Sequence, residues 1–142
     1  MIPVNELPYP WLINAIEKFI EHSPQWNIPI LAEGSCWTAS KEFSDMMREL
    51  KLPKTHIEKV CFNSKCETRK RCFCDRASNL KEHKHDLRKF YPFQSKRMEG
   101  YDMDHRYNYL ELDGKRINID FTAKQFDEEL PYPLIWVSEE NG

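Results

Sequence analysis

The chain has 142 residues, a formal net charge of −2, 40% hydrophobic residues and 31% charged residues. This composition is typical of a globular protein, and the length suffices for one domain with its own core. No apolar run approaches the ~18 residues that a membrane span needs, and the first ten residues lack the features of a secretory signal. We therefore expect a single domain over residues 1–142, a cytoplasmic location, reduced cysteines and no membrane partner.

Two helices are predicted in the N-terminal third. Residues 10–22 carry apolar side chains at helical spacing, with a proline suited to the first turn. A loop is expected over residues 24–29. The second helix is predicted to begin at about Ser35 or Cys36 and to end before Pro53. One stripe of this helix comprises Ala39, Phe43, Met46, Met47 and Leu50.

A basic segment follows a short predicted strand over residues 56–62. Residues 61–97 hold 11 Lys or Arg and 4 Asp or Glu, a balance of +7, against −9 for the rest of the chain. We interpret this segment as a solvated, cysteine-rich insertion within the domain, with a helix near residues 78–90. The alternative is that the positive charge of this segment attracts anionic partners.

The clearest element is a β-hairpin over residues 105–126. Asp113-Gly114 is a strong two-residue turn signal between alternating runs, because both turn positions need positive φ. Pairing Leu112 with Lys115 would fix the register of every other pair. The core face would then comprise Leu110, Leu112, Ile117, Ile119 and Phe121. The opposite face would carry His105, Tyr107, Tyr109, Asn118, Asp120 and Thr122.

This register places a histidine and a carboxylate on one face. Asp120 is predicted opposite Tyr107 and diagonal to His105, at about 7–8 Å between backbone positions. Cys36, at the start of the second helix, has backbone N–H groups nearby that favour a thiolate or a developing oxyanion. We therefore predict Cys36 as nucleophile, His105 as general base and acid, and Asp120 as the residue that orients His105. The alternative is that Cys36 is a small apolar filler of the core.

Three short motifs resemble a known group. The run Gly34-Ser35-Cys36-Trp37 is similar to the G-x-C-W nucleophile motif of transglutaminases and their transglutaminase-like relatives. His105-x-Tyr107 resembles their H-x-W block, with tyrosine in place of tryptophan, and Asp120-x-Thr122 resembles their D-x-T block. Gln125 lies near a position where relatives often have glutamine. The resemblance covers roughly residues 32–50 and 101–126.

The resemblance implies a fold and an activity. It implies an α+β, papain-like fold in which the nucleophile helix packs on an antiparallel sheet. It also implies acyl chemistry through a thioester, as in a protease, an amidase or deamidase, or a transglutaminase, acting on a protein, a peptide or a small amide without a required cofactor. Trp37 and Tyr107 are candidates to shape the substrate site. The basic insertion has no counterpart in the core motif.

The remaining cysteines form a separate cluster. Cys61, Cys66, Cys72 and Cys74 have the pattern C-x4-C-x5-C-x-C, and four thiolates in a short span suit tetrahedral zinc. The spacing lacks the C-x2-C knuckle of common zinc modules, so scattered reduced thiols are the alternative. A second hypothesis follows: a zinc-stabilised basic module on an inactive version of the same fold. It would bind nucleic acid, the less favoured partner, or an acidic protein.

Overall fold

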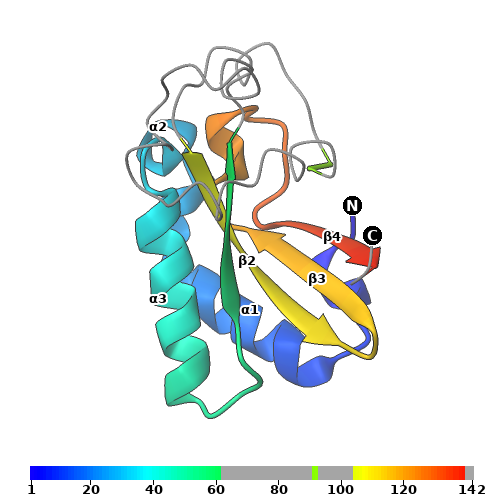
Figure 1. Cartoon of the computed structure of the whole chain (residues 1–142). Helices are drawn as coiled ribbons and strands as arrows, with labels where there is room; N and C mark the ends of the chain where they lie inside the picture. The colour runs from blue at the N-terminus through cyan, green and yellow to red at the C-terminus, as the bar shows by residue number, and fades with distance from the viewer. Residues whose placement is uncertain (62–90, 93–103, 140–142) are drawn as a thin grey trace. The chain divides into compact units, whose positions relative to one another are not determined.

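The structure is a computed structural model that describes residues 1–61, 91–92 and 104–139. These residues divide into two compact units. The first comprises residues 1–57 and 107–142, and the second comprises residues 58–106. Secondary structure is mixed α and β, with helices and an antiparallel four-stranded sheet (Figure 1). In the described part of the chain, no helix is long and apolar enough to cross a bilayer.

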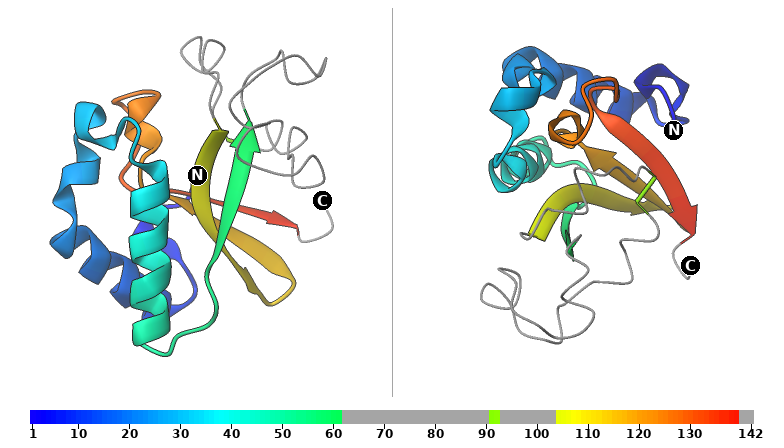
Figure 2. Two further views of the ribbon diagram at one scale, coloured as in Figure 1. Left: turned by 60° about the vertical axis from the view of Figure 1, so that its left-hand side comes forward. Right: turned by 90° about the horizontal axis from the view of Figure 1, so that it is seen from above.

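Both long helices of the first unit form where the sequence predicts them. Helix α1 spans Pro10–His22 with Pro10 in its first turn, and α3 spans Cys36–Glu49. The two helices contact each other, and Figure 2 shows them on the same side of strands β3 and β4. On α3, Ala39, Phe43 and Met47 are buried, whereas Leu50, just past the helix, is 40% exposed. The predicted stripe is therefore confirmed except at its end.

The prediction of a loop over residues 24–29 is wrong. A 3-10 turn, η2, spans Pro24–Asn27, and a short helix, α2, spans Pro29–Ala32. Each begins with a proline, whose fixed φ suits the first turn of a helix. Ala32 is fully buried and anchors α2 to the unit. The apolar periodicity of so short a helix is too brief to be recognised in the sequence.

The sheet has the strand order β1-β2-β3-β4. Its strands are β1 (His56–Cys61), β2 (Asp104–Leu112), β3 (Lys115–Asp120) and β4 (Leu134–Glu139). Leu112 pairs with Lys115 as predicted, and the turn residues Asp113 and Gly114 have φ of 53° and 76°. Strand β4 pairs antiparallel with β3 and was not predicted. A 3-10 turn, η1 (Val4–Glu6), precedes α1, and another, η6 (Ala123–Gln125), follows β3.

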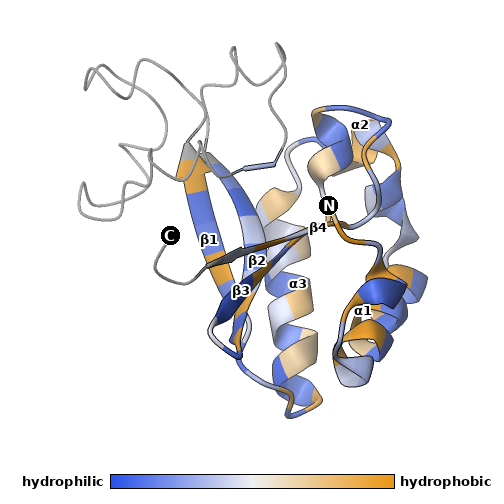
Figure 3. Ribbon diagram, turned by 90° about the vertical axis from the view of Figure 1, so that its right-hand side faces the viewer, coloured by the Kyte–Doolittle hydropathy of each residue, from blue (hydrophilic) through white to orange (hydrophobic). Residues whose placement is uncertain are grey.

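The core of the first unit lies between the helices and one face of the hairpin. Leu110, Ile117, Ile119 and Phe121 belong to it, as the register predicts, and Leu112 packs against it partly buried. Figure 3 shows hydrophobic residues on α1, on α3 and on the strands. The ring of Phe121 lies 4.4 Å from Phe19 of α1 and 4.9 Å from Phe43 of α3, centroid to centroid. The hairpin and both helices thus share one aromatic cluster.

The second unit is described at three places: residues 58–61, 91–92 and 104–106. Val60 and His105 are fully buried, and Glu58 and Tyr91 are nearly so. Most of the predicted insertion, including the helix near residues 78–90, lies outside the described residues.

Candidate functional site

Cys36 is the first residue of α3, as the sequence predicts. The chain reaches it through a tight turn in which Gly34 has a φ of 75°, a conformation that favours glycine. The Ser35 hydroxyl donates to the carbonyl oxygen of Leu31 at 3.0 Å and does not cap α3. The first turn of α3 contains no acidic residue, so no side-chain charge there offsets the positive end of the helix dipole. Cys36 is 7% exposed and is not disulfide-bonded.

Asp120 ends β3 and is held by the residues that follow it. Its Oδ1 accepts hydrogen bonds from the Thr122 backbone N–H at 2.9 Å and the Thr122 hydroxyl at 3.4 Å. Gln125 Nε2 in turn donates to Thr122 Oγ1 at 3.1 Å. All three side chains are buried. The D-x-T block and Gln125 therefore form one hydrogen-bonded chain, which restricts the rotamer of the Asp120 carboxylate.

The segments that carry Cys36 and Asp120 meet within the first unit. Helix α2, which directly precedes the Cys36 turn, contacts η6, which directly follows the Asp120 turn. Figure 1 shows α2 beside the orange helical turn of η6. The contact between Phe43 and Phe121 ties the body of α3 to the residue after Asp120. The nucleophile candidate and the acid candidate thus sit on connected elements.

His105 belongs to the second unit. It is fully buried, and its ring makes an edge contact with Tyr91, 5.8 Å between centroids and 88° between planes. The observed pairing of β2 with β3 runs from Leu112↔Lys115 to Asn108↔Ile119. The pairings of His105 with Cys36 and Asp120 stay predictions.

The two residues predicted to shape the substrate site differ in exposure. Trp37, directly after the cysteine, is 48% exposed, whereas Tyr107 is 4% exposed. The Tyr107 ring packs on Trp136 of β4 with 5.1 Å between centroids, and Arg116 donates to its hydroxyl at 3.5 Å. Trp37 is therefore accessible to solvent, and its substrate role stays a prediction. Tyr107 is enclosed by the sheet, and its substrate role stays a prediction.

Asn108 is a buried polar residue whose role the sequence did not reveal. Its Nδ2 donates to the carbonyl oxygen of Ser40 at 2.9 Å and to the hydroxyl of Ser44 at 3.2 Å. Ser40 lies one turn after Cys36 on α3. Asn108 therefore fixes its part of β2 against α3. The one sequence signal for this contact is that Asn108 is a polar residue at a position that alternates with Leu110 and Leu112, on the predicted core face of the strand.

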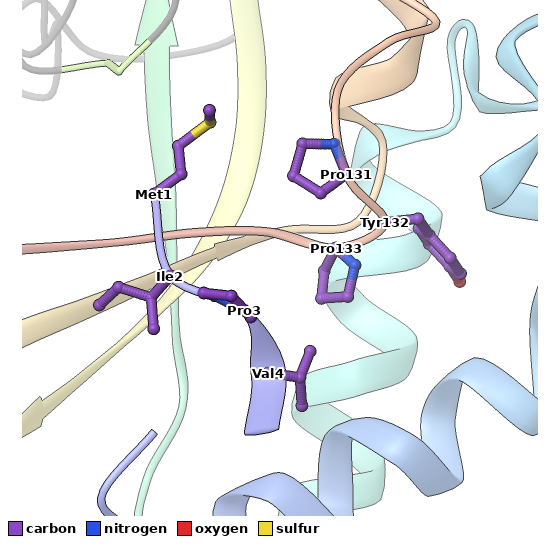
Figure 4. Close-up of a pocket in the computed structure, with 7 residues that line it drawn as sticks. All are labelled: Met1, Ile2, Pro3, Val4, Pro131, Tyr132 and Pro133. Carbon is purple, nitrogen blue, oxygen red and sulfur yellow. The ribbon is translucent and has the colours of Figure 1, made fainter. Parts of the chain in front are cut away.

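Two pockets lie elsewhere in the first unit. One, of about 330 Å³, is lined by residues 1–4 and by Pro131, Tyr132 and Pro133 (Figure 4). The other, also about 330 Å³, lies where α3 ends and is lined by Ser44, Arg48 and residues 52–55. Neither Cys36 nor Asp120 lines either pocket.

The predicted zinc ligands are largely outside the described residues. Cys66, Cys72 and Cys74 fall there, and Cys61 is the last residue of β1. Within residues 1–61, 91–92 and 104–139, no group of three or more His, Cys, Asp or Glu side chains is arranged to hold a metal ion. The zinc cluster therefore stays a prediction.

Fold and site residues together define an α+β protein with a buried cysteine at a helix N-terminus and a tethered aspartate at a strand end. No family model, curated protein or solved structure matches the chain. The likeness to transglutaminase-like enzymes accordingly depends on the three motifs alone.

Proposed function

We propose that the protein is a thiol enzyme of transglutaminase-like type, acting on an amide or acyl bond through Cys36, His105 and Asp120. The observation that carries the proposal is the hydrogen-bonded chain Asp120–Thr122–Gln125, on the element that contacts the segment leading to Cys36. A purely structural cysteine needs no such arrangement. Reducing cytoplasm would keep the thiol available for this chemistry.

The chemistry follows from the residue types. His105 takes the proton of the Cys36 thiol, and the thiolate attacks the carbonyl carbon of the substrate amide. Backbone N–H groups at the start of α3 stabilise the oxyanion that forms. The C–N bond then breaks, the amine leaves with the proton from His105, and a thioester remains on Cys36. Water or a second amine, deprotonated by His105, attacks the thioester and restores the thiol.

Asp120 has a positioning role in this scheme. Its carboxylate would accept from the second ring nitrogen of His105, fixing the tautomer and stabilising the imidazolium. One of its oxygens is already engaged by Thr122, which fixes the direction of the carboxylate. The net reaction, hydrolysis or transfer, depends on whether water or an amine reaches the thioester.

The test is the rate at which iodoacetamide alkylates each cysteine, followed by mass spectrometry of the peptides. Cys36 is 7% exposed, and a buried structural thiol should react slowly. We expect Cys36 to react faster than the other four cysteines, and its rate to fall at least about tenfold in His105→Ala.

Matched variants separate chemistry from folding. His22→Ala changes an exposed histidine at the end of α1 and should leave the Cys36 rate unchanged. His105→Gln fills more of the buried site than alanine, and thermal unfolding of both His105 variants checks that they fold. Equal labelling of all five cysteines, or an unchanged rate in folded His105→Gln, would overturn the proposal.

The alternative is the zinc-stabilised basic binding module on an inactive version of the fold. It depends on cysteines and basic residues that lie mostly outside the described residues, and no observation in the described part favours it.

A further inference from the structure

A hollow of about 330 Å³ lies where α3 ends and the chain turns toward β1. This hollow, here called the α3 hollow, is lined by Ser44, Arg48 and residues 52–55, all of which belong to the first unit. Figure 1 shows the short loop that joins the end of α3 to the start of β1. The volume is at the lower end of the range for small-molecule pockets, about 300–1,000 Å³.

The α3 hollow is separate from the nucleophile candidate. Ser44 and Arg48 follow Cys36 on the same helix. At about 1.5 Å per residue, they lie about 12 and 18 Å from Cys36 along the helix axis. A ligand in the hollow would therefore occupy a second site, independent of the thiol chemistry proposed above.

Hydrogen bonds fix the walls of the α3 hollow. The Ser44 hydroxyl accepts from Asn108 Nδ2 at 3.2 Å and donates to the carbonyl oxygen of Thr55 at 3.4 Å. Asn108 is fully buried on β2. The loop begins at Lys51, whose backbone N–H donates to the carbonyl oxygen of Arg48 at 3.0 Å. The end of α3, the loop and β2 are thus tied together, so the shape of the hollow does not depend on a ligand.

One polar atom of the lining has no partner. Thr55 Oγ1 is buried, and no described residue forms a hydrogen bond with it. The carbonyl oxygen of the same residue is already bonded to Ser44, so the hydroxyl is the group left over. A buried hydroxyl without a partner is unfavourable, because burial has removed its hydrogen bonds with water. An oxygen atom of a ligand in the hollow would supply the missing partner.

The charged side chains that line the hollow, in the described part of the chain, are Arg48 and Lys54, and both are cationic. Lys54 has no ion-pair partner among the described residues. Arg48 Nη2 donates to Asp45 Oδ1 at 2.9 Å, but the other oxygen of Asp45 is paired with Lys41 at 2.8 Å. Two cations therefore share one carboxylate, and Glu49, the next acid on α3, does not line the hollow. This lining favours an anionic ligand.

We propose that the α3 hollow binds the phosphate group of a small phosphate monoester. A guanidinium has five N–H donors, of which the ion pair with Asp45 uses one, so Arg48 can hold a phosphate through two others. Lys54 adds a second positive charge, and the Thr55 hydroxyl donates a hydrogen bond. Leu52 and Pro53 offer apolar surface to the organic part of the ligand.

The helix dipole acts against this binding. The carboxyl end of α3 carries partial negative charge, which favours the two cations and opposes an anion. The attraction therefore comes from the side chains of Arg48 and Lys54. Both are exposed, so we expect the affinity for phosphate to fall as salt is added.

The test is a titration of the ¹⁵N-labelled protein with phenyl phosphate, followed by ¹H–¹⁵N NMR, with inorganic phosphate as the second probe. We expect the amide signals of residues 44–55 to shift along one saturating curve. Phenyl phosphate should bind several-fold more tightly than inorganic phosphate, because its ring buries apolar surface. Absence of a saturating shift would overturn the site, and equal affinity of the two probes would overturn the monoester.

Matched variants locate the phosphate. Arg48→Gln and Lys54→Gln should each weaken phenyl phosphate binding at least about fivefold, and Thr55→Val several-fold. Lys41→Gln is the control, because Lys41 pairs with the same carboxylate as Arg48 but does not line the hollow. It removes the same charge and should change the affinity less than about twofold. Thermal unfolding checks that each variant folds, and equal losses in Lys41→Gln and Lys54→Gln would overturn the site.

Two further outcomes would assign the anion elsewhere. Residues 61–97 are also rich in Lys and Arg. Phenyl phosphate binding that is unchanged in both Lys54→Gln and Thr55→Val would place the phosphate outside the hollow and overturn the proposal. A single-stranded DNA oligonucleotide is the third probe. Oligonucleotide binding that is lost in Lys54→Gln, without saturable binding of phenyl phosphate, would overturn the small-molecule assignment in favour of nucleic acid.

Discussion

Residues 117–122, at the end of β3 and just beyond it, alternate between two sets that are equally buried but chemically opposite. On one face Ile117, Ile119 and Phe121 are 0–3% exposed and pack against the helices. On the other face Asn118, Asp120 and Thr122 are each 1% exposed. Burial of the first set follows from the hydrophobic effect, whereas burial of the second set is unfavourable unless hydrogen bonds replace water.

The polar face meets this requirement with specific partners. Asn118 accepts from Arg116 Nε at 2.9 Å and donates to the Trp136 carbonyl oxygen at 3.2 Å. Asp120 is held by Thr122, as described above. A protein that needed only stability would gain more from apolar residues at these positions. The comparison therefore separates a face that folds the unit from a face that positions polar groups.

The largest expected effect comes from the apolar face. Phe121→Ala removes a ring that contacts Phe19 and Phe43, and should lower the free energy of unfolding by about 3–5 kcal/mol. Urea unfolding measures this loss. Val137→Ala, at a position 38% exposed on β4, is the control and should cost well under half as much. Similar losses in the two variants would break the distinction between a folding face and a positioning face.

Local signals explain what the sequence predicts about this hairpin. The Asp113-Gly114 turn and strict alternation determine the register, and Pro10 marks the start of α1. Strand β4 was missed because it pairs with β3 across a loop of more than ten residues, and nothing near residue 134 encodes that partner. The bond from Gln125 to Thr122 was also not predicted, since it requires the η6 turn.

The site was predictable to a similar degree. The position of Cys36 at a helix start follows from sequence periodicity, and the place of Asp120 on the returning strand follows from the register. The end of β3 at Asp120 was not predicted, because the hairpin was expected to run on to residue 126. The exposure of Ile30 and Leu31 does not follow from the sequence, because an apolar residue before a core helix is expected to be buried. Tertiary contacts of α2 with η2 and η6 decide which of its side chains face solvent.

A substitution on the polar face should lower stability less than Phe121→Ala does, but it should slow the alkylation of Cys36. Asp120→Asn keeps a side-chain oxygen that can accept from the Thr122 backbone N–H. The free energy of unfolding should therefore change by about 1 kcal/mol or less. Under the proposed mechanism the variant loses the carboxylate that would stabilise the His105 imidazolium, so Cys36 alkylation should slow about tenfold. Iodoacetamide kinetics measure this.

A matched aspartate is the control for this prediction. Asp127 accepts the backbone N–H of Glu129 at 2.9 Å, in the same i, i+2 geometry as Asp120 and Thr122. Asp127→Asn should leave the Cys36 rate unchanged. If both variants slow alkylation alike, the effect belongs to turn structure and not to the polar face.

The smallest effect is expected at the tip of the hairpin, which belongs to neither face. The Tyr9 hydroxyl donates to Asp113 Oδ2 at 2.6 Å at the surface. This hydrogen bond, with burial and the Asp113 charge, raises the pKa of Tyr9 above its usual 10. The neutral phenol is the form that donates, so the contribution is present below pH 10 and lost as pH rises through the raised pKa.

Tyr9→Phe should therefore lower the unfolding free energy at pH 7 by under ~1 kcal/mol. A double-mutant cycle with Asp113→Gly isolates the contact, because glycine removes the acceptor and tolerates the positive φ of this turn position. Urea unfolding of the four proteins gives the coupling energy at pH 7, and we expect it to fall as the pH rises through the raised pKa of Tyr9. A coupling as large as the Phe121→Ala loss would mean that the tip, and not the apolar face, holds the hairpin in register.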